Sequence, residues 1–125
     1  IDVSLDETSR RITGKEHITY HNHSPDRLTY LWVQLENNRF RASSAGNLTA
    51  GAPDLSNGMS FDALHKRLER AAFDGGFDIT EVAHLQEPLP HIIHDTMMRV
   101  DLPQPLLPGE HFEFDIAWNF LVNDP

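Results

Sequence analysis

The chain has 125 residues, no cysteine and a formal net charge of −9 at pH 7, from 10 basic and 19 acidic side chains. This length suits a single domain, and the missing cysteines exclude disulfides, Cys-based zinc sites and a thiol nucleophile. The acidic balance disfavours binding to nucleic acid, and no apolar run approaches the roughly 20 residues that a membrane-spanning helix needs.

Strand patterns dominate the first third of the chain. Residues 1–5 and 10–22 alternate apolar and polar side chains, which is the period of a half-buried strand. Residues 22–26 (NHSPD) supply turn-forming side chains. The run at 28–35 (LTYLWVQL) is apolar enough to predict a strand that is buried on both faces.

The middle of the chain differs from the rest. Residues 41–59 are rich in Ser, Gly, Ala and Asn and predict a long loop. A helix is predicted at about 60–72, with Ser60 as its N-cap. Its apolar side chains recur at helical spacing: Phe61, Leu64, Leu68 and Ala71 or Ala72. This stripe predicts docking of the helix on the sheet, and insertion into a partner's groove is the alternative.

Further strands are predicted at 77–85, 90–95 and 96–102, with a tight connection at 103–110. The clearest strand covers 111–122, because its large apolar side chains all fall on one side: Phe112, Phe114, Ile116, Trp118, Phe120 and Val122. The sequence therefore predicts one domain over residues 1–125. Its fold class is mainly β: a twisted antiparallel β-sandwich, a saddle-like sheet, with one inserted amphipathic helix.

Histidines form a stripe on the second predicted strand. His17 and His21, continued by His23, lie on the face opposite Ile18, whereas Glu16 points the other way. A catalytic zinc site usually needs three protein ligands plus water, so the stripe predicts a solvated sheet face. A zinc site stays open as the alternative, because strand pairing can bring in other histidines: His84, His91, His94 or His111.

Two other groups of side chains have a functional and a structural interpretation. His111, Glu113 and Asp115 share one face of the last strand and can be read as a paired-carboxylate site. The opposite face is so apolar that we expect this one to be exposed or partly exposed. Tyr30 and Trp32 share a face of their strand and are the candidates for a binding surface, or else belong to the core.

Catalytic signatures are missing from the sequence. It contains no H-E-x-x-H, no G-x-S-x-G, no phosphate loop and no dinucleotide glycine fingerprint. We therefore expect no catalytic, cofactor-binding or metal-binding residue in this chain. The chain has no signal peptide that we recognise, and its composition is compatible with the cytoplasm and the periplasm alike.

Two stretches carry a family resemblance. The first, residues 12–40, contains Gly14 with Glu16, Asn22 with Ser24–Pro25, and Leu35 with Asn38. The second, residues 97–118, contains a Leu-x-Pro-Gly-Glu connection at 106–110 that leads into the long alternating strand. Together they resemble the N-terminal β-domain of the aminopeptidase N family of zinc metallopeptidases. The resemblance covers most of the chain and is weakest over residues 41–75.

The resemblance implies an accessory, non-catalytic domain. In that family a saddle-like β-domain packs against a thermolysin-like catalytic domain, which holds zinc through H-E-x-x-H and a distant glutamate. The implied partners are then the catalytic domain of the same parent chain and that enzyme's peptide substrates. No cofactor is expected in the chain itself, because the family's zinc and substrate motifs match no position here. The alternatives are a stand-alone carbohydrate- or protein-binding module and a small histidine-based metalloprotein.

Overall fold

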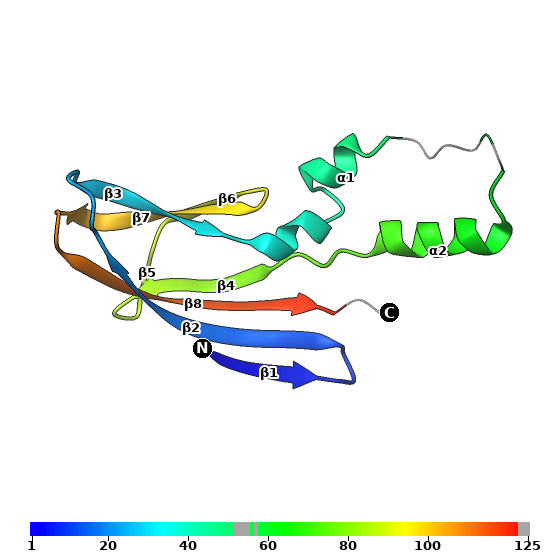
Figure 1. The fold of residues 1–125 in the computed structure, drawn as a ribbon. Helices are drawn as coiled ribbons and strands as arrows, with labels where there is room; N and C mark the ends of the chain where they lie inside the picture. Colours follow the sequence, from blue (N-terminus) through cyan, green and yellow to red (C-terminus); the bar gives the residue numbers. More distant parts are fainter. Residues whose placement is uncertain (52–55, 57, 123–125) are drawn as a thin grey trace.

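The computed structural model describes residues 1–51, 56 and 58–122, without the side chains of Arg70 and Ala71. Two antiparallel sheets make up the fold (Figure 1). The larger sheet has five strands in the order β1 (Asp2–Asp6), β2 (Arg11–His21), β8 (His111–Leu121), β4 (Asp78–His84) and β5 (Glu87–Pro88). The smaller sheet has three, in the order β3 (Leu28–Gln34), β7 (Met97–Leu106) and β6 (His91–His94). The predicted mainly-β fold class, with two packed layers and one longer helix, is confirmed.

The core lies between the two sheets. It is formed by side chains from both layers, all at most 6% exposed: Leu31, Leu35, Val82, Leu89, Met98, Val100, Phe114 and Ile116. Phe114 and Ile116 come from the strongly alternating strand β8, so the predicted face of that strand is the one that is buried. Packing of this kind is the main source of stability in a domain of this size.

Gly14 creates space for the largest side chain of β8. Gly14 lies directly opposite Trp118 in the β2–β8 pairing. A Cβ atom at position 14 would lie 2.4 Å from Cζ2 of the Trp118 ring. The glycine therefore allows the indole to lie against the backbone of β2, which is a close approach that no other residue permits.

Two expectations about burial were wrong. Strand β3 is not buried on both faces, because Tyr30 and Trp32 are 40% and 54% exposed. Strand β1 is not half-buried either, since Val3 and Leu5 are each 58% exposed. Each strand lies at the edge of its sheet, and the described residues leave these side chains uncovered. All five residues of β1 are exposed, and β1 is the strand farthest from the smaller sheet in Figure 1.

The expected long loop at 41–59 contains helical structure. A short helix, α1, covers Ala45–Thr49 within it, and a 3₁₀ helix, η1, directly precedes it at Glu36–Phe40. Ser44 caps α1 by accepting a hydrogen bond from the backbone N–H of Asn47 at 3.2 Å. The Ser, Gly and Asn residues of this segment thus form caps and turns as well as loop. Residues 52–55 and 57 of the expected loop lie outside the described part of the chain.

Helix α2 (Phe61–Ala72) confirms the predicted element but not its predicted docking. Ser60 caps it, with its Oγ accepting from the N–H of Ala63 at 3.2 Å. The apolar stripe is uncovered, since Phe61, Leu64 and Leu68 are 90%, 42% and 59% exposed. Figure 1 shows α2 extending away from both sheets. Among the described helices, none is long and apolar enough to cross a membrane.

Asp6, the last residue of β1, has a shifted pKa. The Ser9 hydroxyl donates to Asp6 at 2.6 Å, and the N–H groups of Ser9 and Thr8 donate as well. These bonds favour the charged form and lower the pKa of Asp6, with the hydroxyl contributing most. Their contribution to stability is therefore present above the ordinary pKa of aspartate and is lost as the pH falls through the lowered value.

Candidate functional site

The histidine stripe lies on the outer face of the β2–β8 pair. The pairing places His17 opposite Asp115 and His21 opposite His111. Nδ1 of His17 lies 3.0 Å from Oδ1 of Asp115, and its Nε2 lies 3.7 Å from Oε2 of Glu113. The rings of His21 and His111 are 5.5 Å apart, centre to centre. The stripe is thus flanked by carboxylates of β8.

This histidine–carboxylate stripe is a solvated surface, as we predicted for both strands. The side chains of His17, His111 and Glu113 are 57%, 58% and 48% exposed. Within the described residues, no group of three or more His, Asp or Glu side chains is arranged to hold a metal ion. Ion pairs at such exposure contribute little to stability.

The other histidines that we considered as extra ligands lie elsewhere. Nδ1 of His84 is 2.6 Å from the backbone oxygen of Glu113, and its ring packs on Phe112. Nδ1 of His91 is 3.0 Å from the backbone oxygen of Leu89. His94 is the last residue of β6 and lines a separate cleft. Of these candidates, strand pairing brings only His111 to the stripe.

We expect the purified chain to contain no stoichiometric zinc and to hydrolyse no aminoacyl-anilide substrate. The stripe offers exposed ligands without the three convergent groups that a catalytic zinc site uses. Elemental analysis of the protein checks the first expectation, and a chromogenic assay checks the second. About one tightly bound metal ion per chain would contradict the expectation and favour the metalloprotein alternative.

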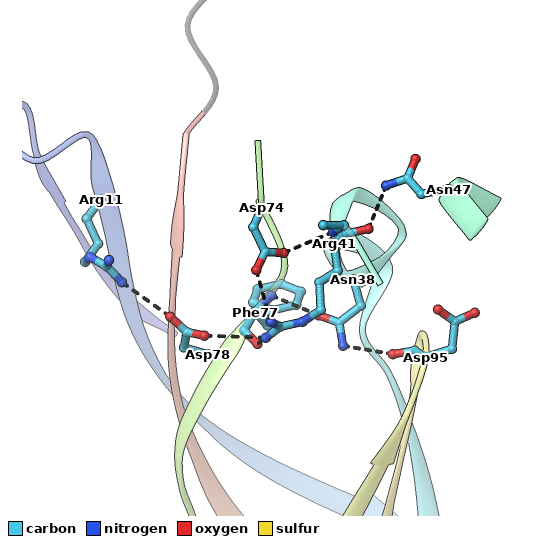
Figure 2. Close-up of polar contacts among 9 residues, drawn as sticks. Arg11, Asn38, Arg41, Asn47, Asp74, Phe77, Asp78 and Asp95 are labelled. Atoms are coloured by element: carbon cyan, nitrogen blue, oxygen red, sulfur yellow. Dashed lines mark hydrogen bonds and ion pairs between the residues drawn. The ribbon is translucent and has the colours of Figure 1, made fainter. Parts of the chain in front are cut away.

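A cleft of about 560 Å³ lies between the segment around α1 and the turn between β6 and β7. Beside it a polar network joins three segments of the chain (Figure 2). The Arg41 guanidinium donates to the backbone oxygen of Phe77 and lies 3.4 Å from Asp78 and 3.9 Å from Asp74. Asn47 donates to the backbone oxygen of Arg41 at 2.6 Å. The Arg41 guanidinium therefore joins its own segment to the residues just before and at the start of β4.

Asn38 is the buried centre of the same network (Figure 2). It is 1% exposed, and its amide donates to the backbone oxygen of Asp95 at 2.8 Å. Its oxygen accepts from the N–H of Phe77 at 2.9 Å. Asn38 thus ties η1 to the β6–β7 turn and to the residue that precedes β4. The network is a structural clamp, and we assign it no catalytic role.

Asn22 performs a similar task at the other end of the sheets. It is 1% exposed, and its amide donates to the backbone oxygens of Asp26 at 2.8 Å and Leu106 at 3.1 Å. Its backbone oxygen accepts from the N–H of Gly109 at 2.8 Å. Gly109 has φ +83°, as a type II turn with Pro108 before it requires. The two stretches that carry the family resemblance therefore touch each other here.

Most of the motif residues behind the resemblance have a structural role. Gly14 makes room for Trp118, and Leu35 belongs to the core. The side chains of Asn22 and Asn38 form hydrogen bonds to buried backbone groups. Pro108–Gly109 forms a turn. Sequence reasoning identified Asn22 and Asn38 as motif positions but not as buried hydrogen-bonding centres. Glu16 is the exception, because its carboxylate makes no hydrogen bond or ion pair with the described part of the chain.

Comparison with family models, with curated proteins and with solved structures found no match to this chain. The fold and the surfaces described above define a mainly-β domain with a structural polar clamp. The resemblance to the aminopeptidase N family stays a prediction that rests on the two sequence stretches.

Proposed function

We propose that this chain is an accessory N-terminal β-domain of a zinc-dependent aminopeptidase, which packs against the catalytic domain and helps to wall its active-site cleft. One observation carries the packing part of the proposal. On the core side of the larger sheet, the row Leu5–Ile12–Phe120 runs across three paired strands, and Leu5 at its edge is 58% exposed. Val3, on the same side, is exposed to the same extent.

An apolar row that ends in exposed side chains at the edge of a sheet favours contact with another protein surface. Burying apolar area is worth roughly 25 cal/mol per Å², and exposed apolar patches often mark interaction sites. Helix α2 offers a second uncovered stripe through Phe61, Leu64 and Leu68. The sequence resemblance supplies the identity of the partner, which is a catalytic domain of the same parent chain.

Under this proposal, zinc and peptide chemistry belong to the catalytic domain. The described residues contain a histidine–carboxylate stripe at the surface and a clamp around Arg41, neither of which is a convergent catalytic group. A rigid two-layer sheet beside an active-site cleft limits solvent access to that cleft. This chain would therefore act through its shape and its contacts.

The coding sequence and hydrogen exchange test the proposal. The reading frame is expected to continue past Pro125 and, within roughly 100–200 residues after the β-domain, to encode H-E-x-x-H with a more distant glutamate. In the longer protein, amides of β1 should exchange at least tenfold more slowly than in the 125-residue chain. A reading frame that lacks this motif would contradict the aminopeptidase assignment. Equal exchange rates of the β1 amides in the two proteins would contradict the proposed packing contact.

A stand-alone binding module is the second candidate, and one observation favours it. Tyr30 and Trp32 are exposed on the outer face of the smaller sheet, with their rings 6.1 Å apart. The Arg99 guanidinium lies 4.2 Å from the centre of the Tyr30 ring. Trp, Tyr and Arg are the side chains that contribute most often to binding hot spots. Under this alternative, a protein or carbohydrate ligand would lose its affinity in the Trp32→Ala variant.

A further inference from the structure

A second cleft, of about 230 Å³, opens between the two sheets. Its walls come from β2, β3, β8 and the start of β4, and they are almost entirely apolar or aromatic: Val33, Leu35, Phe77, Ile79, Ile116 and Trp118. Glu16 and Gln34 are its polar lining residues. Gln34 is uncharged, and its amide donates to Glu36. Glu16 is therefore the charged side chain among the residues that line this cleft.

Glu16 is partly buried on the core side of β2, where charged side chains are rare. Among the described residues, no cation or hydrogen-bond donor pairs with its carboxylate, because the nearby cations have other partners. Lys15 points to the opposite face and lies 3.4 Å from Glu81. Arg41 is held by the backbone oxygen of Phe77 and by Asp78. A carboxylate in an apolar setting costs free energy unless a cation or hydrogen-bond donors compensate it.

Two aromatic rings line the same cleft as this carboxylate. The rings of Phe77 and Trp118 are 5.3 Å apart and inclined by 73°, so they form two nearly perpendicular walls. Gly14 fixes the position of the indole, and Glu16 follows two residues later on the same face of β2. Aromatic faces attract cations, tryptophan most strongly, and the attraction rises when water is displaced.

We propose that this cleft binds an alkylammonium group, with its hydrocarbon chain against the apolar walls and its charge between Glu16 and the aromatic rings. The net charge of −9 favours a cationic ligand at long range as well. The volume of 230 Å³ equals that of roughly seven or eight waters at ~30 Å³ each, enough for a chain of about six heavy atoms. A lysine side chain of a partner and a free aliphatic amine share this chemistry. The proposal does not depend on the aminopeptidase assignment.

Nuclear magnetic resonance with n-pentylammonium as the probe tests the proposal. The Trp32→Phe variant of the whole 125-residue chain leaves Trp118 as the single indole, and residue 32 does not line the cleft. We expect a saturable shift of the Trp118 indole N–H signal. The uncharged analogue 1-pentanol should bind at least tenfold more weakly, because it fills the apolar walls without pairing with Glu16.

Two variants locate the charge that matters. Glu16→Gln should weaken pentylammonium binding at least tenfold and leave pentanol binding unchanged. Glu113→Gln removes a carboxylate from the outer face of the same sheet and should change neither, since Glu113 does not line the cleft. A spectrum with native dispersion establishes that each variant is folded.

A second probe, Nα-acetyl-lysine N-methylamide, distinguishes a lysine side chain of a partner from a free aliphatic amine. Binding of this probe with pentylammonium-like affinity assigns the cleft to a lysine of a partner polypeptide, and its failure assigns the cleft to a free amine. Equal affinities for pentylammonium and pentanol would overturn the proposal, even if the Glu16→Gln variant did not fold. Shifts that leave the Trp118 signal unmoved, or unchanged binding in folded Glu16→Gln, would overturn it as well.

Discussion

Replacing Trp118 by alanine is expected to lower the free energy of unfolding by about 3–5 kcal/mol, the range for truncating a large core aromatic. The indole packs against the buried cluster of the core, stands edge-to-face with Phe77 at 5.3 Å and stacks with Phe120 at 5.7 Å. Truncation removes all of these contacts and leaves a cavity over Gly14. Urea denaturation followed by circular dichroism measures the change.

The surface of the same strand provides the control. Glu113→Ala, on the outer face of β8, should change the free energy of unfolding by no more than about 0.5 kcal/mol. Its side chain is 48% exposed, and its nearest partners are exposed histidines. Equal losses in the two variants would mean that the two faces of β8 are not distinguished by burial.

A double-mutant cycle makes the Trp118 argument sharper. Gly14→Ala alone should destabilise the protein by about 1–3 kcal/mol, because its Cβ would lie 2.4 Å from the ring and the indole would have to move. In the Trp118→Ala background the obstacle is gone, and alanine at position 14 should then be neutral or slightly stabilising. The same penalty in both backgrounds would mean that Gly14 serves a purpose other than accommodating the indole.

The elements with strong periodicity could be predicted from the sequence, because alternation depends only on local backbone geometry. Strands β2 and β8 and helix α2 were predicted at nearly their observed bounds. Periodicity states which side chains share a face but not whether anything covers that face. Val3 in β1 and Leu64 in α2 were therefore expected in contacts that the described part of the chain does not provide.

The candidate sites depend on pairing and packing between distant residues. The sequence placed His17 and Asp115 on exposed strand faces, but only the β2–β8 register puts them opposite each other. It also placed Glu16 on the face opposite the histidines. The cleft beside Glu16 needs Val33 from the other sheet and Phe77 from the segment before β4, and no local pattern predicts that they meet.

The buried asparagines show the same limit. Asn22 was predicted to help form a turn, which it does through the N–H and hydroxyl of Ser24. Its burial depends instead on Leu106, which lies 84 residues further along the chain. A turn-forming residue type identifies a turn, whereas its role as a buried hydrogen-bonding centre follows only from the tertiary fold.

Asn38→Leu is expected to destabilise the protein by about 2–5 kcal/mol, although leucine is similar in size. The substitution leaves two backbone groups without partners, namely the oxygen of Asp95 and the N–H of Phe77. An unsatisfied buried polar group costs roughly 1–3 kcal/mol. Both losses fall at one junction, which joins η1, the β6–β7 turn and the residue preceding β4 (Figure 2). The amide of Phe77 should therefore also exchange with solvent faster than in the unmodified protein.

The preceding residue provides a matched control, because Asn37 is in the same 3₁₀ helix but is less buried than Asn38. Asn37→Leu makes the same chemical change without removing a partner from Asp95 or Phe77, so it should cost no more than about 0.5 kcal/mol. Urea denaturation measures both variants, and hydrogen exchange follows the Phe77 amide. Similar losses at positions 37 and 38 would indicate that leucine disturbs η1 itself. A loss at position 38 alone, with faster exchange at Phe77, would show that the buried amide joins the two sheets at this junction.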